Sequence, residues 1–310
     1  MPQAAMIGAG LIGRAWASVF ARAGWDVAIY DAADGAAQHA RALIGDSLEE
    51  QAAHGLARDP KAAAARVRVA RDVADALNGA TLVQESLPEL VETKQAIFRE
   101  LDRLAAPDTI LASSTSTIVA SKFTEDLAGR ARCLVAHPVN PPHLVPLVEL
   151  AGAPWTDPAV VARAKAIYEA VDQVPIVVRR EVDGFILNRL QAALLSEAFR
   201  LVGEGYVSPQ DCDKTLKDGL GLRWSFMGPF ETIELNAPGG IPDYCARYGP
   251  SLGRLQGTMG GPEVYDAANV DRILAEWGGS PTTEHIAERM EWRDRRLAAL
   301  RAHKASQPEA

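Results

Sequence analysis

The stretch MIGAGLIGRAWASVFARAGWDVAIYD, residues 6–31, carries the pattern that decides the fold. Its glycines, Gly8, Gly10 and Gly13, follow a short apolar run typical of a buried strand and precede a run with helical spacing of apolar residues. A second β-rich run, WDVAIYD, ends on Asp31, which lies 18 residues after Gly13. A strand, a glycine turn, a helix, a second strand and a terminal acid in this order are typical of a dinucleotide-binding βαβ unit.

Each glycine has its own physical role in such a unit. Gly8 permits the tight turn, Gly10 lets the backbone approach a pyrophosphate, and Gly13 lets the helix pack close to the strand. The unpaired N–H groups of the first helical turn and the positive end of the helix dipole attract the phosphates. We therefore expect Leu11 and Ile12, which begin the helix, among the cofactor contacts.

Asp31 indicates which dinucleotide the unit accepts. Its carboxylate is placed to accept hydrogen bonds from both ribose hydroxyls and to repel a 2′-phosphate, which favours NAD over NADP. The alternative is a glycine-rich turn in an α/β domain that binds nothing. The acid at the expected distance favours the cofactor.

The composition limits the class of protein and its partners. At 310 residues the chain is longer than one average domain, so we expect two. A formal charge of -8, from 32 basic and 40 acidic residues, without a basic cluster, argues against a nucleic-acid partner. No apolar run approaches the length of a membrane span, and the first predicted strand begins close to Met1. We therefore expect neither a membrane segment nor a signal peptide.

The cysteines indicate the compartment. Cys133, Cys212 and Cys245 are an odd number, widely spaced, with no CxxC pair. This pattern is typical of the reduced thiols of a cytoplasmic protein and predicts neither a disulfide framework nor a metal site.

Strands and helices alternate over roughly the first 180 residues. After the opening unit, strand-like runs occur at residues 66–70, 80–86, 109–115, 132–138, 144–152 and 174–180. This alternation predicts a Rossmann-type, doubly wound and mostly parallel sheet with ligand sites at the carboxyl ends of its strands. Short Pro-rich loops separate the later strands, so these need not all be parallel.

The pattern changes near residue 183. Residues 184–205 read as one long helix, Ser208 is a helix cap with Pro209 at the first helical position, and residues 284–304 form an amphipathic helix. No convincing strand follows residue 180. We therefore expect an NAD-binding Rossmann domain over residues 1–182 and an all-helical substrate and dimerisation domain over residues 183–310.

His137 and Glu149 are candidates for acid–base chemistry. His137 ends the strand CLVA, where a bound nicotinamide would lie, and Glu149 interrupts the apolar run VPLVEL. On a neighbouring strand, Glu149 would meet the imidazole, fix its tautomer and stabilise its charged form. The alternatives are a strand-end histidine bonded to a loop and an edge glutamate that points to water.

Four further polar residues have two readings each. Ser116, in SSTST, is either a hydroxyl for a substrate oxygen or a helix cap. Asn188 lies in an apolar helix, where it either holds a substrate group or faces water. Glu89 and Lys94 either reach a ribose or form a solvated pair.

Together, GAGLIG, SSTST, HPVNPPHLVPLVEL and GFILNRLQ resemble the 3-hydroxyacyl-CoA dehydrogenase family over almost the whole chain. The intervals agree as well, with 21 residues from Ser116 to His137, 12 from His137 to Glu149 and 51 from His137 to Asn188. Residues 204–240 are similar to the λ-crystallin and L-gulonate 3-dehydrogenase branch.

The resemblance implies a role for each of these residues. His137 would be the catalytic base and Glu149 its partner, while Ser116 and Asn188 would assist the substrate and the nicotinamide. The implied cofactor contacts are Gly8, Gly10, Gly13, Asp31, Glu89 and Lys94.

Two features depart from the acyl-CoA members of the family. Those enzymes typically read His-Phe-Phe-Asn-Pro where this chain has HPVNP, and no basic patch here suits the phosphates of coenzyme A. Arg223, in GLGLRWSFMGP, instead suits the carboxylate of a compact substrate. The alternative for Arg223 is an ion pair within its domain or at an interface, and the resemblance implies a dimer contact in this segment.

The sequence therefore predicts an NAD-dependent dehydrogenase that acts on the 3-hydroxyl of a small hydroxy acid, with L-gulonate as the leading substrate, in a homodimer. Three alternatives stay open. They are an L-3-hydroxyacyl-CoA dehydrogenase, an L-carnitine dehydrogenase with Trp224 and Phe226 in an aromatic cage, and a non-catalytic, crystallin-like protein that binds NAD(H).

Overall fold

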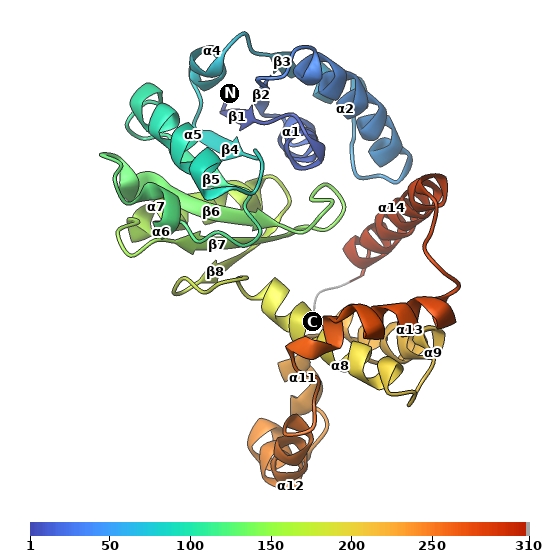
Figure 1. Ribbon diagram of the computed structural model, residues 1–310. Coiled ribbons are helices and arrows are strands. Elements are labelled where there is room, and N and C mark those ends of the chain that lie inside the picture. Colours follow the sequence, from blue (N-terminus) through green and yellow to red (C-terminus); the bar gives the residue numbers. More distant parts are fainter. Residues whose placement is uncertain (308–310) are drawn as a thin grey trace. The chain divides into compact units, whose positions relative to one another are not determined.

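The computed structural model describes residues 1–307, and the chain divides into two compact units. The first unit contains one eight-stranded sheet in the order β3-β2-β1-β4-β5-β6-β7-β8 (Figure 1). Its strands are β1 (Gln3–Ile7), β2 (Asp26–Tyr30), β3 (Val67–Val69), β4 (Leu82–Glu85), β5 (Ile110–Ser113), β6 (Cys133–Pro138), β7 (Leu147–Gly152) and β8 (Val174–Val178). Every predicted strand run contains one of these strands. Neighbours are parallel except β6 and β7, which are antiparallel.

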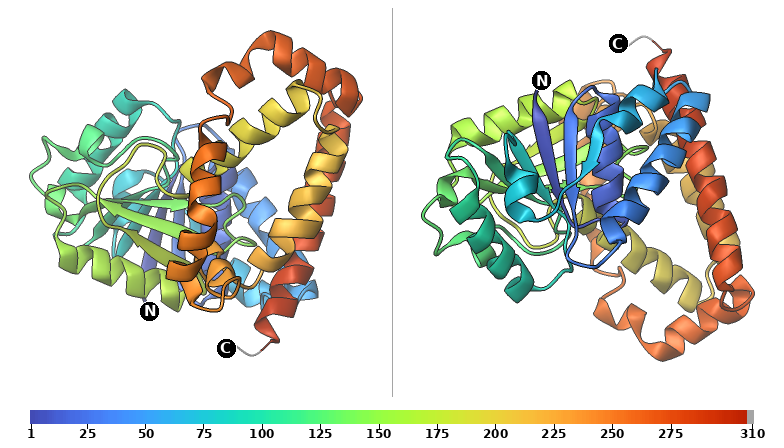
Figure 2. Two further views of the ribbon diagram at one scale, coloured as in Figure 1. Left: turned by 90° about the horizontal axis from the view of Figure 1, so that it is seen from below. Right: turned by 90° about the horizontal axis from the view of Figure 1, so that it is seen from above.

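Helices cover both faces of the sheet (Figure 2). One apolar core contains side chains of α1 (Leu11–Arg22), α2 (Ala36–Ala53), α3 (Pro60–Ala65) and α7 (Pro158–Ala170). The core on the other face contains side chains of α4 (Val73–Leu77), α5 (Val91–Leu104) and α6 (Ser121–Thr124). Burial on both faces explains why the inner strands, such as β4, β5 and β6, read as continuous apolar runs. The predicted Rossmann-type, doubly wound architecture is confirmed.

The strand order reverses between β1 and β4. From β1 the chain proceeds through β2 and β3 on one side and then returns to place β4 on the other side of β1. In doubly wound sheets, the crevice for ligands opens at this reversal, outside the carboxyl ends of the strands. The glycine turn follows β1 at this edge, and Ser86 follows β4.

The second unit, Asn188–Met290, is helical, and its described residues contain no strand. Its helices are α8 (Leu187–Gly203), α9 (Pro209–Lys214), α10 (Gly221–Trp224), α11 (Pro229–Glu234), α12 (Gly240–Gln256), α13 (Ala267–Trp277) and the first part of α14 (Thr283–Ala305). A π-helical segment, Thr215–Leu220, joins α9 to α10. The expected helical second domain is confirmed.

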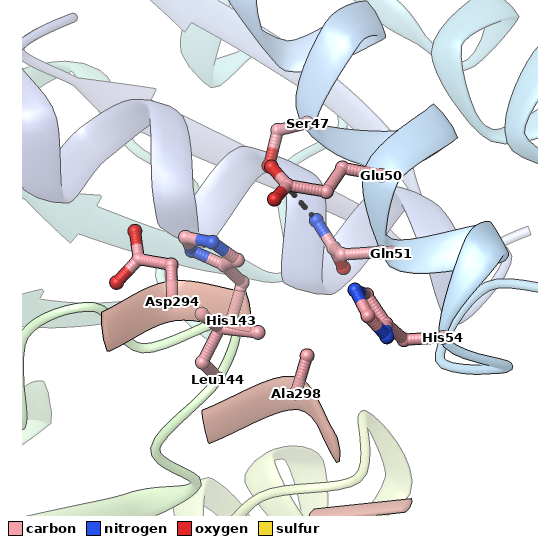
Figure 3. Close-up of a pocket in the computed structure, with 8 residues that line it drawn as sticks. All are labelled: Ser47, Glu50, Gln51, His54, His143, Leu144, Asp294 and Ala298. Atoms are coloured by element: carbon pink, nitrogen blue, oxygen red, sulfur yellow. Dashed lines mark hydrogen bonds between the residues drawn. The ribbon is translucent and has the colours of Figure 1, made fainter. Parts of the chain in front are cut away.

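The division of the chain differs from the predicted boundaries in two respects, the first being that residues 183–187 belong to the first unit. The second is that residues 291–307 also group with the first unit, because the end of α14 packs there. The Arg301 guanidinium donates to the carbonyl of His143 at 2.9 Å and to the carboxylate of Asp172 at 2.6 Å. A small cavity of about 10 Å³ lies between α2, the loop after β6 and α14 (Figure 3).

Cys133, Cys212 and Cys245 are free thiols. Among residues 1–307, no helix combines the length and apolar character that crossing a bilayer requires.

Candidate functional site

The pairing of β6 with β7 brings His137 and Glu149 together. The two residues lie directly opposite one another on these antiparallel strands. His137 Nδ1 lies 2.8 Å from Glu149 Oε2, and the residues are only 4% and 0% exposed. The carboxylate therefore requires the Nδ1 proton, which leaves Nε2 of a neutral imidazole unprotonated.

The second oxygen of Glu149 binds the start of α8. The backbone N–H groups of Ile186 and Leu187 donate to Oε1 at 2.9 and 3.0 Å. Burial raises the pKa of Glu149, but the bonds from His137, Leu187 and Ile186 more than offset this, and the net pKa lies below its ordinary value. The carboxylate is thus buried, charged and held at both oxygens.

An unusual backbone conformation places these two amides. Gly184 and Phe185 have successive positive φ angles of 76° and 48°, and Phe185 is a bulky residue in a region that favours glycine. The Phe185 ring is fully buried, and its centroid lies 5.4 Å from that of His137. This turn directs the amides of Ile186 and Leu187 at Glu149 and covers the imidazole with an apolar ring.

The glycine turn at the end of β1 has the geometry of a nucleotide cradle. Gly8 has a φ of 100°, and a Cβ at Gly13 would lie only 1.9 Å from the Gly8 carbonyl oxygen, so neither position tolerates a side chain. A Cβ at Gly10 would meet no atom within 4 Å. The helix α1 begins after Gly10 without a side-chain cap, and Leu11 is 53% exposed. An anion therefore has open access to the backbone N–H groups of the first turn.

Asp31 follows β2 and binds back to this turn. Its Oδ2 accepts from the Ala9 N–H at 2.7 Å, and its Oδ1 accepts from the Ala33 N–H at 2.9 Å. Each oxygen keeps a further lone pair for a hydroxyl donor. The residues at this edge of the sheet fit a dinucleotide with a free 2′-hydroxyl.

Comparison with known proteins matches both units. Residues 3–182 match the NAD binding domain of 3-hydroxyacyl-CoA dehydrogenase, and residues 184–278 match the C-terminal domain of the same family. The chain belongs to the 3-hydroxyacyl-CoA dehydrogenase family. It is accordingly an NAD-dependent oxidoreductase of this family, and its cofactor is NAD.

Relatives within the 3-hydroxyacyl-CoA dehydrogenase family agree with the predicted branch. A λ-crystallin homolog of Bos taurus is 42% identical over 96% of this chain and 95% of its own length. An L-carnitine dehydrogenase of Pseudomonas putida is 35% identical over 97% of this chain and 94% of its own. The solved structure of 5-formyl-3-hydroxy-2-methylpyridine 4-carboxylic acid 5-dehydrogenase, an NAD+-dependent dismutase, has a TM-score of 0.84. It is 28% identical and covers 99% of this chain and 100% of that one.

Glu89 holds the loop that carries Ser116. Its Oε1 accepts from the Thr115 hydroxyl at 2.6 Å and from the Ser116 and Thr117 N–H groups at 2.9 Å each. Burial raises the pKa of Glu89, but the bonds from Thr115 and Thr117 and the charge of Lys94 bring it below its ordinary value. Glu89 thus fixes the segment after β5 at the carboxyl edge of the sheet, where Ser116 is exposed.

Lys94 lies in the interior rather than in a solvated pair with Glu89. It is 1% exposed, and its Nζ donates to Glu85 Oε1 at 2.8 Å and to the Leu87 carbonyl at 2.9 Å. Its distance to Glu89 Oε2 is 3.9 Å. Glu85 is fully buried and also accepts from Ser113 at 2.6 Å. The main observed role of Lys94 is therefore to neutralise a buried carboxylate.

Asn188 and Arg223 belong to the second unit. Asn188 occupies the first turn of α8, directly after Leu187, whose N–H binds Glu149. Arg223 lies on α10, is exposed, and forms no ion pair with any described residue. An ion pair within the chain, one alternative reading of Arg223, is thus not formed within the described part.

Sequence reasoning missed three features of the site. The acid that ends the buried run LVQE, Glu85, was a detectable signal, since a carboxylate in an apolar strand requires a partner. The positive φ of Phe185 left no signal, because that conformation is rare for phenylalanine. The amides of Ile186 and Leu187 could not be found without it.

Proposed function

We propose that the protein oxidises the 3-hydroxyl group of a small hydroxy acid, with L-gulonate as the leading substrate. The buried hydrogen bond between His137 and Glu149, beside the carboxyl edge of an NAD-binding sheet, is the observation that carries the proposal. NAD, when bound, supplies the nicotinamide that accepts the hydride from carbon 3 of the substrate. The products are the 3-oxo acid, NADH and one proton.

The proton passes to His137 in this proposal. Nε2 is the free nitrogen of the imidazole, because Glu149 holds the Nδ1 proton, and it takes the proton of the hydroxyl as the carbonyl forms. The imidazolium is stabilised by the carboxylate at 2.8 Å. Phe185 excludes water from one side of the ring, which strengthens this interaction.

Cofactor and substrate contacts complete the proposed site. Ser116 and Asn188 hold the reacting oxygen, and Arg223 binds the carboxylate. The proposed cofactor contacts are Gly8, Gly10, Leu11, Ile12, Gly13, Asp31 and Glu89, with Lys94 acting through Glu85 and Glu89. The open backbone at Gly10 supports the glycine turn as the diphosphate site. The two hydrogen bonds that Asp31 accepts support Asp31 as the ribose contact.

A panel of substrates tests the proposal. L-gulonate, L-carnitine and L-3-hydroxybutyrate are assayed with NAD+ by NADH absorbance, and acetoacetyl-CoA is assayed with NADH in reverse. We expect L-gulonate to give the highest kcat/KM. Higher activity on acetoacetyl-CoA or on L-carnitine would show that this compound, and not L-gulonate, is the substrate. NADH binding without turnover of any substrate would indicate a non-catalytic, crystallin-like role.

L-carnitine is the alternative with a specific observation in its favour. Trp224 and Phe226 are 41% and 70% exposed beside Arg223, and exposed aromatic faces attract a quaternary ammonium. The carboxylate of L-carnitine would use Arg223 in the same way as L-gulonate. The variant Trp224→Leu separates the two, because only turnover of the cationic substrate depends on the aromatic ring.

A further inference from the structure

We propose that the Ser86 hydroxyl donates a hydrogen bond to an oxygen of the bound dinucleotide, and that a buried chain of polar side chains fixes the direction of this bond. The inference rests on the proposed function, which places NAD over the glycine turn. The chain consists of Tyr168, Gln84, Ser114 and Ser86.

Ser86 lies against the glycine turn. It follows the last residue of β4, and its N–H donates to the Ile7 carbonyl at the end of β1 at 2.7 Å. An added Cβ on Gly8 would lie 2.7 Å from the Ser86 carbonyl oxygen, and one on Gly13 would lie 3.6 Å from Ser86 Cβ. The half-buried Ser86 side chain therefore stands where the strand order reverses and the ligand crevice opens.

The hydrogen-bond partners of Gln84 fix the orientation of its side-chain amide. Gln84 is fully buried, and its Nε2 lies 2.6 Å from Ser114 Oγ and 3.3 Å from the Ala136 carbonyl oxygen. A carbonyl oxygen only accepts, so the NH2 group must face Ala136. The Oε1 atom then faces Tyr168, whose hydroxyl donates to it. Burial raises the pKa of Tyr168, which keeps this hydroxyl protonated.

The hydrogen bonds from Tyr168 to Ser86 then have one consistent donor-to-acceptor direction. Both amide hydrogens of Gln84 are used, and Ser114 Oγ accepts one of them. The other recorded partner of Ser114 Oγ is Ser86 Oγ at 2.9 Å. If Ser86 donated to Ser114, the proton of the buried Ser114 would have no acceptor among residues 1–307, which is costly. Ser114 therefore donates to Ser86.

This direction leaves the proton of Ser86 for a ligand. In the part of the chain that the structure describes, no group is recorded as its acceptor. Asp31 follows β2 and Ser86 follows β4, on opposite sides of β1, so the oxygens that Ser86 would meet are those of the nicotinamide-side phosphate and ribose, all of which accept. Because the hydroxyl is oriented before binding, little rotational freedom is lost when the bond forms.

Nucleotide affinity tests the proposal directly. Fluorescence titration measures the Kd of NADH for the full-length protein and the variant Ser86→Ala, with ADP-ribose and AMP as competing ligands. We expect NADH and ADP-ribose to bind about 5- to 10-fold more weakly to the variant. AMP, which lacks the second phosphate and ribose, should bind within about twofold, and this also shows that the variant is folded.

A double-mutant cycle tests the orienting role of the chain. We expect Ser114→Ala to weaken NADH binding by about threefold in the wild-type background and to have no further effect in Ser86→Ala. A positioning role through Ser86 requires this non-additivity. Equal effects of Ser114→Ala in both backgrounds would show that Ser114 acts on stability alone. This result would overturn the proposed orienting role of the hydrogen-bonded side chains.

The controls separate this proposal from the proposed function. An unchanged NADH Kd in Ser86→Ala, or an equal loss of AMP affinity, would overturn the role of Ser86. The variant Asp31→Ala reports on the cofactor site itself. If wild-type protein failed to bind NADH, or if Asp31→Ala bound it as tightly as the wild type, the proposed cofactor site would be wrong.

Discussion

At the scale of single residues, the proposed proton transfer depends on the tautomer of His137. Glu149 accepts from two backbone amides through one oxygen, so its other oxygen faces Nδ1 of the imidazole. This arrangement leaves Nε2 as the basic nitrogen. The carboxylate thus determines which nitrogen can take a proton from substrate.

Replacing Glu149 with glutamine should reverse the tautomer. The amide oxygen would keep the bonds from Ile186 and Leu187, so the NH2 group would face Nδ1 and force the proton onto Nε2. We expect Glu149→Gln to lower kcat at least about 100-fold, with the NADH Kd within about twofold. Steady-state kinetics and fluorescence titration measure both quantities. Glu169→Gln, on the exposed side of α7, is the matched control, and an unchanged kcat in Glu149→Gln would refute this role.

Lys94 allows a second test at this scale. We expect Lys94→Met to lower the free energy of unfolding by about 3 kcal/mol, because Glu85 would remain buried without its cation. Denaturant unfolding measures this loss, and Lys165→Met on α7, which is 43% exposed, should change it by less than about 0.5 kcal/mol. A variant of unchanged stability with weakened NADH binding would instead make Lys94 a direct nucleotide contact.

At the scale of elements, the sequence predicts what local patterns determine. All eight strands and the glycine turn are predicted by short β-rich or apolar runs and by glycine spacing, because strand burial and steric exclusion leave local patterns. The 12 residues between His137 and Glu149 predict a return on a neighbouring strand, and the antiparallel register agrees. The burial of Lys94 and the strained turn at Phe185 depend on tertiary contacts and left no local pattern.

The loop after β5 should make stability depend on pH. The pKa of Glu89 is lower in the folded chain than its ordinary value of 4.5. Its contribution to stability is therefore present above that value and is lost as the pH falls through the lowered one. We expect the Tm of the wild type to fall more steeply between about pH 5 and pH 3 than that of Glu89→Gln, as calorimetry can measure. Parallel curves for the two proteins would show that Glu89 does not hold the loop.

At the scale of the whole molecule, the second unit exposes many large apolar side chains. Phe230 and Leu235 are each 72% exposed, Phe226 is 70% exposed, and Leu190 is 64% exposed. On the first part of α14, Ile286 is 46% exposed. Apolar surface on this scale is typical of an interface with another chain. We propose that a second copy covers it, in the expected homodimer.

The mass in solution tests the dimer. We expect light scattering to give twice the chain mass of 33.2 kDa at micromolar concentration. The variant Phe230→Asp should shift the equilibrium toward the monomer, because a charge would be buried at the interface. The control Arg41→Asp changes an exposed position on α2 and should leave the dimer intact. A monomeric wild type would contradict the proposal.

The contribution of Arg223 also belongs to this scale. Its guanidinium is exposed and forms no ion pair with any of residues 1–307, so a substrate carboxylate and a second copy are both available partners. The sequence identifies Arg223 as a candidate anion-binding residue but does not identify its partner, because the partner depends on tertiary and quaternary contacts.

The turnover number of His137→Gln with the best substrate of the panel shows whether this imidazole is the base. We predict a fall in kcat of about 1000-fold at saturating NAD+ and substrate, because glutamine cannot take the proton from the hydroxyl group. A kcat within about threefold of the wild type would contradict the assignment of His137 as the base.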